Sequence, residues 1–295
     1  MNKKALWSLR IALLIGTVIS LFFVPWPLVS TWLAPLPNTI QQQIDEATQD
    51  HFDGMIVYVQ QGQQPATIFT AGWHDRAKQL PAEPNALFKI ASISKLYVAL
   101  ATTKLINDGQ LSLNDSLSQL LPKVSQHLPN ANEITLRMLL QHRSGLPNFT
   151  DTPNYWSNPP ATASEKLALI MDEPADFAPD SDYAYCNTNY LLLTQIINHT
   201  VGYSYQQYIT DRILQPLALQ NTYFSLDAIN IKDLMGGYYV GVQPNIKEND
   251  YGSMIASITD VGRFIRALND GSAFAPGEQA IYSSVYKFEH GGLIP

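Results

Sequence analysis

The order of apolar and polar positions divides the chain into an uncharged N-terminal stretch and a longer part with mixed strand and helix patterns. Residues 11–33 carry no charged side chain and follow three basic residues in the first ten. A run of this length can cross a bilayer as one helix. Pro25 and Pro27 are expected to kink or end that helix, because proline removes a backbone donor and crowds the preceding turn.

From residue 38 onward, the pattern predicts strands at both ends and helices in the middle. Alternating apolar residues predict strands at 54–60, 66–72 and 285–290. Helical spacing with capping residues and terminal glycines predicts helices at 38–52, 92–107, 136–142, 166–171, 187–200, 205–214 and 260–268. The polar segment 73–87 and the proline-rich segment 146–161 are predicted connections.

These elements predict an α+β fold. We expect a mainly antiparallel sheet built from both ends of the soluble chain, flanked by helices, with a helical subdomain inserted. The sheet part would comprise residues 38–91 and 221–295, and the helical part residues 92–220. A site would lie in the cleft between the two parts.

Composition excludes several classes of function. The 295 residues carry a net charge of −7 without a basic tract, so we expect no nucleic-acid partner. The six histidines are scattered and no His-Glu-x-x-His occurs, so we expect no metal and no other cofactor. The single cysteine, Cys186, forms no internal disulfide. A nucleophilic role and a small buried residue both remain open for it, and the absence of a basic neighbour in sequence favours burial.

Residues 1–37 have two interpretations, an uncleaved membrane anchor or a removed signal peptide. The anchor is favoured because a small-x-small cleavage site is hard to place: Trp32 stands two residues before Ala34, and Pro35 follows it. In both cases the basic end stays cytoplasmic and the domain from residue 38 lies outside the cytoplasm. Trp26 and Trp32 suit the far membrane interface.

The strongest chemical pattern is Ser92-Ile93-Ser94-Lys95 at the start of the helix predicted for 92–107. Three residues apart on a helix place a serine and a lysine on one face, and an amine can then activate the hydroxyl as a nucleophile. A helix-start serine followed by a solvated lysine is the competing interpretation. A second Ser-x-x-Lys, at Ser284 and Lys287, lies in the run predicted as a strand, so we interpret it as chance.

Two more groups fit the same chemistry. Tyr185 and Asn187 precede the helix predicted for 187–200, where a phenol can transfer a proton and an amide can hold a lysine and a substrate carbonyl. His290 and Gly292 end the last predicted strand, where glycine lets a substrate backbone approach. The structural alternative for the first group is a packed tyrosine with a helix-capping asparagine. For the second group it is a turn with a histidine whose hydrogen bonds are satisfied.

In this order, the motifs resemble those of the serine β-lactamase and penicillin-binding-protein superfamily, nearest to the class C β-lactamases, D-alanyl-D-alanine carboxypeptidases and related esterases. Segments 134–147 and 216–222 add to the resemblance, which spans about residues 40–295. It implies an acylated nucleophile, Ser92, activated by Lys95, and a general base or acid, Tyr185. It further implies that Asn187, His290 and Gly292 bind substrate, and that the N–H groups of Ser92 and Leu293 form the oxyanion hole.

The resemblance has departures. Cys186 replaces a smaller residue, Arg143 stands where many relatives have threonine, and Pro295 ends the chain where the family continues through two strands and a helix. We therefore expect C-terminal truncation. The preferred function is a membrane-anchored, extracytoplasmic serine hydrolase acting through an acyl-enzyme on a D-amino-acid peptide, a β-lactam or a small ester. The alternative is a non-catalytic module that binds cell-wall peptide or a protein, or an inactive fragment. The sequence does not indicate an oligomeric state.

Overall fold

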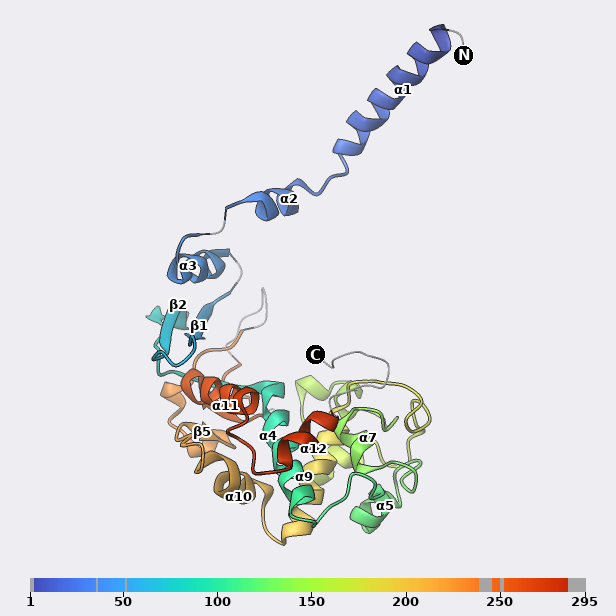
Figure 1. Ribbon diagram of the computed structural model, residues 1–295, viewed down its shortest axis with the longest axis vertical. Helices are drawn as coiled ribbons and strands as arrows, with labels where there is room; N and C mark the ends of the chain where they lie inside the picture. The colour runs from blue at the N-terminus through green and yellow to red at the C-terminus, as the bar shows by residue number, and fades with distance from the viewer. Residues whose placement is uncertain (1–2, 36, 51, 239–245, 250–251, 286–295) are drawn as a thin grey trace.

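The N-terminal helices lie apart from the rest of the molecule. The computed structural model describes residues 3–35, 37–50, 52–238, 246–249 and 252–285 (Figure 1). Helix α1 spans Lys3–Leu21 and α2 spans Trp26–Leu33, so the predicted break near Pro25 is confirmed. Helix α1 is long and apolar enough to cross a membrane, and none of its residues is buried.

The first sheet is the predicted hairpin with one added strand. Strands β1 (Gly54–Val59) and β2 (Thr67–Asp75) pair antiparallel, and β3 (Leu80–Pro81) extends the sheet in the order β1-β2-β3. Strand β3 lies in the segment predicted as a connection. Helix α3 (Ile40–Asp50), predicted as 38–52, packs on β2.

The second sheet joins distant parts of the soluble chain. Strand β6 (Ile255–Ser257) lies between β4 (Leu87–Lys89) and β5 (Thr222–Tyr223), and both pairings are antiparallel. Strands of two or three residues are too short for a periodic signal, which is why the sequence pattern did not predict them. The α+β class is confirmed, with small antiparallel sheets beside a larger helical region.

Helices fill the middle of the chain as predicted, although several are shorter. Thr135 and Thr162 each cap a helix by accepting a bond from the backbone N–H three residues later, and Gly202 ends α9 in the left-handed conformation. The predicted helix 205–214 is divided into α10 and a π-helical turn over Thr210–Leu214. The α-helices of this region are α4 Ser94–Asn107, α5 Leu117–Leu120, α6 Pro122–Ser125, α7 Leu136–Leu140, α8 Ala163–Ala168, α9 Asn187–Val201 and α10 Tyr205–Ile209.

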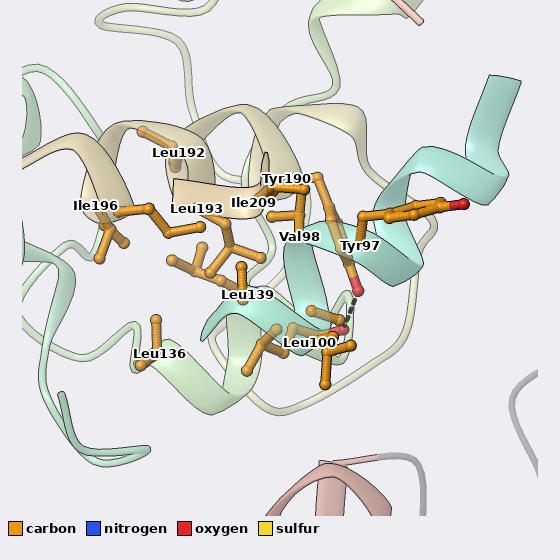
Figure 2. Close-up of a cluster of buried hydrophobic side chains, with 14 of the residues drawn as sticks. Tyr97, Val98, Leu100, Leu136, Leu139, Tyr190, Leu192, Leu193, Ile196 and Ile209 are labelled. Atoms are coloured by element: carbon orange, nitrogen blue, oxygen red, sulfur yellow. Dashed lines mark hydrogen bonds between the residues drawn. The ribbon is translucent and has the colours of Figure 1, made fainter. Parts of the chain in front are cut away.

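The main core lies where α4, α7 and α9 meet (Figure 2). Leu100, Leu139 and Leu193 come from these three helices, and their side chains have no exposed surface. Each such leucine contributes about 1.5–3 kcal/mol by leaving water. The hydroxyl of Tyr190 donates to the carbonyl of Leu140, drawn as a dashed line in Figure 2, at 3.2 Å. This core holds the first turn of α4 against the start of α9.

Two C-terminal helices complete the described part. Helix α11 (Ile258–Asp270) lies against β1, and its C-terminal Gly271 has a positive φ, as the stop predicted for 260–268 requires. Helix α12 spans Glu278–Val285. The predicted strand 285–290 is therefore wrong at Val285, and residues 286–290 lie outside the described ranges.

The helical state of α12 has a tertiary cause. Gln141 donates to the carbonyl of Val285 at 2.8 Å and Arg137 donates to that of Ser284 at 3.4 Å, so α7 and its C-cap residue satisfy the last carbonyls of α12. The Ser284 hydroxyl donates to Ile281 within the helix. The strand argument for dismissing Ser284 is therefore wrong, and Lys287 lies outside the described residues.

Candidate active site

Ser92 lies in a tight turn that leads into α4. A 3₁₀ turn over Ala91–Ile93 precedes the helix, and Ala91 adopts a positive φ of 45°. Met254, the residue just before β6, holds this turn: Ile90 N–H donates to the Met254 carbonyl at 2.9 Å, and Met254 N–H donates to the Ser94 hydroxyl at 3.1 Å. The Ser92 side chain therefore remains exposed at a rigid corner.

The structure brings four of the predicted site residues together. The Ser92 Oγ lies 2.6 Å from the Tyr185 hydroxyl and 3.4 Å from Lys95 Nζ. Lys95 Nζ donates to Asn187 Oδ1 at 2.9 Å. Residues about ninety positions apart thus form one hydrogen-bonded cluster, which joins α4 to the segment that opens α9.

Lys95 is held by oxygen dipoles and aromatic faces. Its Nζ lies 4.9 Å from the Tyr185 ring centroid and 5.7 Å from that of Tyr190, both within cation–π range. In the described part of the chain, no carboxylate lies within 4 Å of this nitrogen. Its position therefore depends on Asn187 and on the two rings.

The Asn187 amide is oriented by the proline-rich loop. Asn148 Oδ1 accepts from the Asn187 backbone N–H at 3.0 Å and from its Nδ2 at 3.4 Å, and Thr150 Oγ1 accepts from Nδ2 at 3.1 Å. Two acceptors at Nδ2 direct Oδ1 toward Lys95. The sequence pattern did not identify Asn148 or Thr150, because a loop polar residue has no local signature of this contact.

Both departures near the site have a structural explanation. Cys186 is buried and its Sγ lies 3.3 Å from the Leu146 carbonyl, so the side chain points away from Ser92. Burial raises the pKa of its thiol, which disfavours a nucleophilic thiolate. The prediction that Cys186 is a small buried residue is confirmed. Arg143 forms an ion pair with Asp180 at 2.5 Å, on a segment that runs beside it.

His142 is a site neighbour that sequence reasoning missed. Its ring centroid lies 4.7 Å from that of Tyr185 and 5.1 Å from that of Tyr190, and its side chain is buried. Burial, and then the Lys95 charge, lower the pKa of His142 to about 4. Its membership of segment 134–147 was the one available signal.

The remaining predicted site residues come from the last segment of the chain. His290, Gly292 and Leu293 lie outside the described residues, so their contribution stays a prediction. Within the described ranges, no three His, Cys, Asp or Glu side chains gather as metal ligands would. A cavity of about 590 Å³ is lined by residues between Gln206 and Ala228, away from Ser92. Asn148 is among the residues that line a smaller cavity of about 350 Å³.

A sequence model described as beta-lactamase matches residues 37–287. The chain belongs to the beta-lactamase family. It is 30% identical over 223 residues to Protein flp of Staphylococcus aureus strain MW2, which is 73% of this chain and 45% of flp. It is 27% identical over 215 residues to the teichoic acid D-alanine hydrolase of Staphylococcus aureus, covering 70% of this chain and 51% of the hydrolase. The chain thus spans about half the length of these curated relatives.

Solved structures agree on the fold. The D-amino acid amidase of Ochrobactrum anthropi SV3, in complex with D-phenylalanine, superposes with a TM-score of 0.72 at 25% identity, covering 83% of this chain and 74% of the amidase. The octameric penicillin-binding protein homologue of Pyrococcus abyssi gives 0.69 at 23% identity, covering 83% and 58%. The fold is therefore that of the serine β-lactamase and penicillin-binding-protein superfamily, as the motifs implied.

Proposed function

We propose that this protein is a serine hydrolase that forms an acyl-enzyme on Ser92. The observation that carries the proposal is the 2.6 Å contact between Ser92 Oγ and the Tyr185 hydroxyl, with Lys95 bridging Ser92 and Asn187. A nucleophile within hydrogen-bond reach of its base, and a base oriented by further groups, is the arrangement that covalent catalysis requires. Asn148 and Thr150 hold Asn187 from behind.

In the proposed reaction, Ser92 Oγ attacks the substrate carbonyl carbon while its proton passes to the Tyr185–Lys95 pair, which acts as base in the form that lacks one proton. The carbonyl double bond becomes an oxyanion, stabilised by backbone N–H groups at Ser92 and, by resemblance, Leu293. The oxyanion then collapses, the amine or alcohol leaves with the proton from Tyr185, and an ester to Ser92 remains. Water then adds to that ester while the same pair takes its proton, and the pair returns a proton to Ser92 Oγ as the acid product leaves.

The substrate class we propose is an amide or ester of a D-amino acid, or a β-lactam. Support comes from the relatives: one is named a teichoic acid D-alanine hydrolase and another a D-amino acid amidase. A pair that can protonate either an amine or an alcohol leaving group fits both. A non-catalytic binding module on the same fold is the rival.

Intact-mass spectrometry tests the proposal. The full chain is incubated with a fluorophosphonate and, separately, with a penicillin. One adduct per chain is expected on the wild type and none on Ser92→Ala, while Ser284→Ala, a matched serine in a second Ser-x-x-Lys, labels as the wild type does. A folded wild type without any adduct, or equal labelling of Ser92→Ala, would refute the acyl-enzyme on Ser92 and favour the binding module.

We also propose that the N-terminus stays attached as an anchor and that the catalytic domain lies outside the cytoplasm. Helix α1 has nineteen residues, about 28 Å at 1.5 Å each, with its three basic residues in the first eight positions, and it is long and apolar enough to cross a membrane. Lys3, Lys4 and Arg10 would then hold one end cytoplasmic. The exposed Trp26 and Trp32 of α2 suit the opposite interface.

A further inference from the structure

His142 occupies a constrained position directly behind the proposed catalytic tyrosine. It follows the last turn of α7 with a positive φ of 57°, a conformation that costs about 1–2 kcal/mol for a residue with a Cβ. Only 6% of its surface is exposed. Strain and burial together at a titratable residue indicate that the surrounding contacts hold it there.

Two hydrogen bonds tie His142 to the segment that carries Tyr185. The His142 carbonyl accepts from the Ala184 N–H at 3.1 Å, and its Nδ1 accepts from the Cys186 N–H at 3.1 Å. Residue 185 is held between these two anchored amides. Because Nδ1 is an acceptor, the neutral ring carries its proton on Nε2.

The ring of His142 also supports the ring of Tyr185. The two planes are inclined by 34° with centroids 4.7 Å apart, and Tyr190 packs at 5.1 Å. Tyr185 is 44% exposed, and it also contacts the Ser92 hydroxyl and the Lys95 amine. A partly exposed side chain loses conformational entropy when it is held in one rotamer. The contacts with a packed neighbour offset that loss.

We infer that His142, as a neutral imidazole with its proton on Nε2, is a positioning residue that holds the Tyr185 phenol against the Ser92 hydroxyl. This inference rests on the proposed function. His142 touches no reacting atom and acts through Tyr185. The proposed role requires the neutral ring, because a protonated ring could not accept the Cys186 N–H and would place a second cation beside Lys95.

The groups around the ring favour the neutral form. Lys95 approaches the ring from α4, and Tyr190 approaches it from α9. Tyr185 comes from the segment before α9, and Tyr183 meets the ring edge-on with the centroids 6.2 Å apart. Arg143, the next residue, pairs with Asp180. Among the described residues, the charge that acts on the ring is that of Lys95, and it opposes protonation of His142.

The test compares three variants of the full chain by their second-order rate of labelling with a fluorophosphonate. His142→Leu keeps bulk but removes the acceptor, and it is expected to label about a hundredfold more slowly. His142→Asn offers an amide oxygen near the position of Nδ1 and tolerates positive φ, so it is expected to recover most of the rate. His127→Leu, at an exposed histidine paired with Asp172, is the matched control and should label as the wild type does.

Wild-type labelling by a folded His142→Leu would overturn the inference and leave the proposed function standing, whereas an unlabelled wild type would overturn the function. The ring can also be examined without substitution, so a variant that fails to fold does not end the test. The ¹⁵N shifts of His142 in the wild type at pH 7 should show a bare Nδ1 and a protonated Nε2. The opposite tautomer would overturn the inference.

Discussion

Lys104 of α4 and Glu278 of α12 form a buried ion pair, with Nζ 2.8 Å from Oε2 and the two side chains 9% and 1% exposed. Lys104 also donates to the Ala273 carbonyl at 3.1 Å, and Glu278 accepts from the Ala275 N–H at 2.8 Å. Each charge is thus compensated by hydrogen bonds as well as by its partner. The pair joins α12 to α4, the helix that begins beside Ser92.

Removing one partner of this pair should lower the free energy of unfolding far more than replacing both partners with apolar residues. Glu278→Gln leaves the Lys104 ammonium buried and uncompensated, so we expect the free energy of unfolding to fall by about 3–5 kcal/mol. The double variant Lys104→Met, Glu278→Leu should lose less than the sum of the single variants. Urea unfolding measures both quantities. Additive losses would show that the two side chains do not depend on each other.

Lys95→Arg should slow acylation of Ser92 by at least about a hundredfold. The guanidinium cannot give up its proton, and its planar fork does not fit the place of a compact ammonium between Asn187 and two rings. The measurement is the second-order labelling rate, with folding checked by circular dichroism. A near-normal rate would show that Tyr185 takes the proton without an amine.

Acid should destabilise the protein through His142. Its pKa is about 4 in the folded chain against about 6.5 when unfolded, so the unfolded chain binds the extra proton first. His142 makes its full contribution to the free energy of unfolding above pH 6.5. This contribution falls by about 3 kcal/mol as the pH falls toward 4.

His142→Asn cannot titrate, so it isolates this effect. The free energy by which the wild type exceeds the variant should shrink by about 3 kcal/mol between pH 7 and pH 4 in urea unfolding. A difference that stays constant over this range would mean that His142 protonates equally in both states.

Gly145→Ala should disrupt the site, whereas Gly109→Ala should not. Both glycines have φ near +70°, so both substitutions carry the same left-handed strain of about 1–2 kcal/mol. A Cβ at Gly145 would lie 2.0 Å from the Phe177 carbonyl oxygen, and one at Gly109 meets nothing within 4 Å. We expect Gly145→Ala to lose at least about 2 kcal/mol more, measured by thermal unfolding. Equal losses would contradict the close approach of these segments.

The N-terminus of the membrane-bound protein should begin at residue 1 or 2. Helix α1 is apolar, unburied and long enough to span a bilayer. N-terminal sequencing of the membrane fraction, after alkaline extraction, provides the measurement. A mature chain that starts near residue 35 and is released by extraction would identify a signal peptide instead.

The sequence by itself determined the features that depend on neighbouring residues. Hairpin β1–β2, the caps at Thr135 and Thr162 and the stops at Gly202 and Gly271 follow from short-range hydrogen bonds and backbone preferences. The motif order indicated Ser92, Lys95, Tyr185 and Asn187, and the structure brings these four side chains together, while their roles stay predictions. The division at residue 38 also stays a prediction.

Only the tertiary structure decided the features that depend on distant contacts. Strand β6 exists because β4 and β5 lie on either side of it. Helix α12 is stabilised by Lys104 of α4, which compensates its buried carboxylate, and by Gln141, which satisfies its last carbonyl. The amide of Asn187 is oriented by a loop about forty residues away, and His142 lies behind Tyr185. A local sequence pattern contains no information about such partners, because these contacts contribute free energy only when the chain has folded.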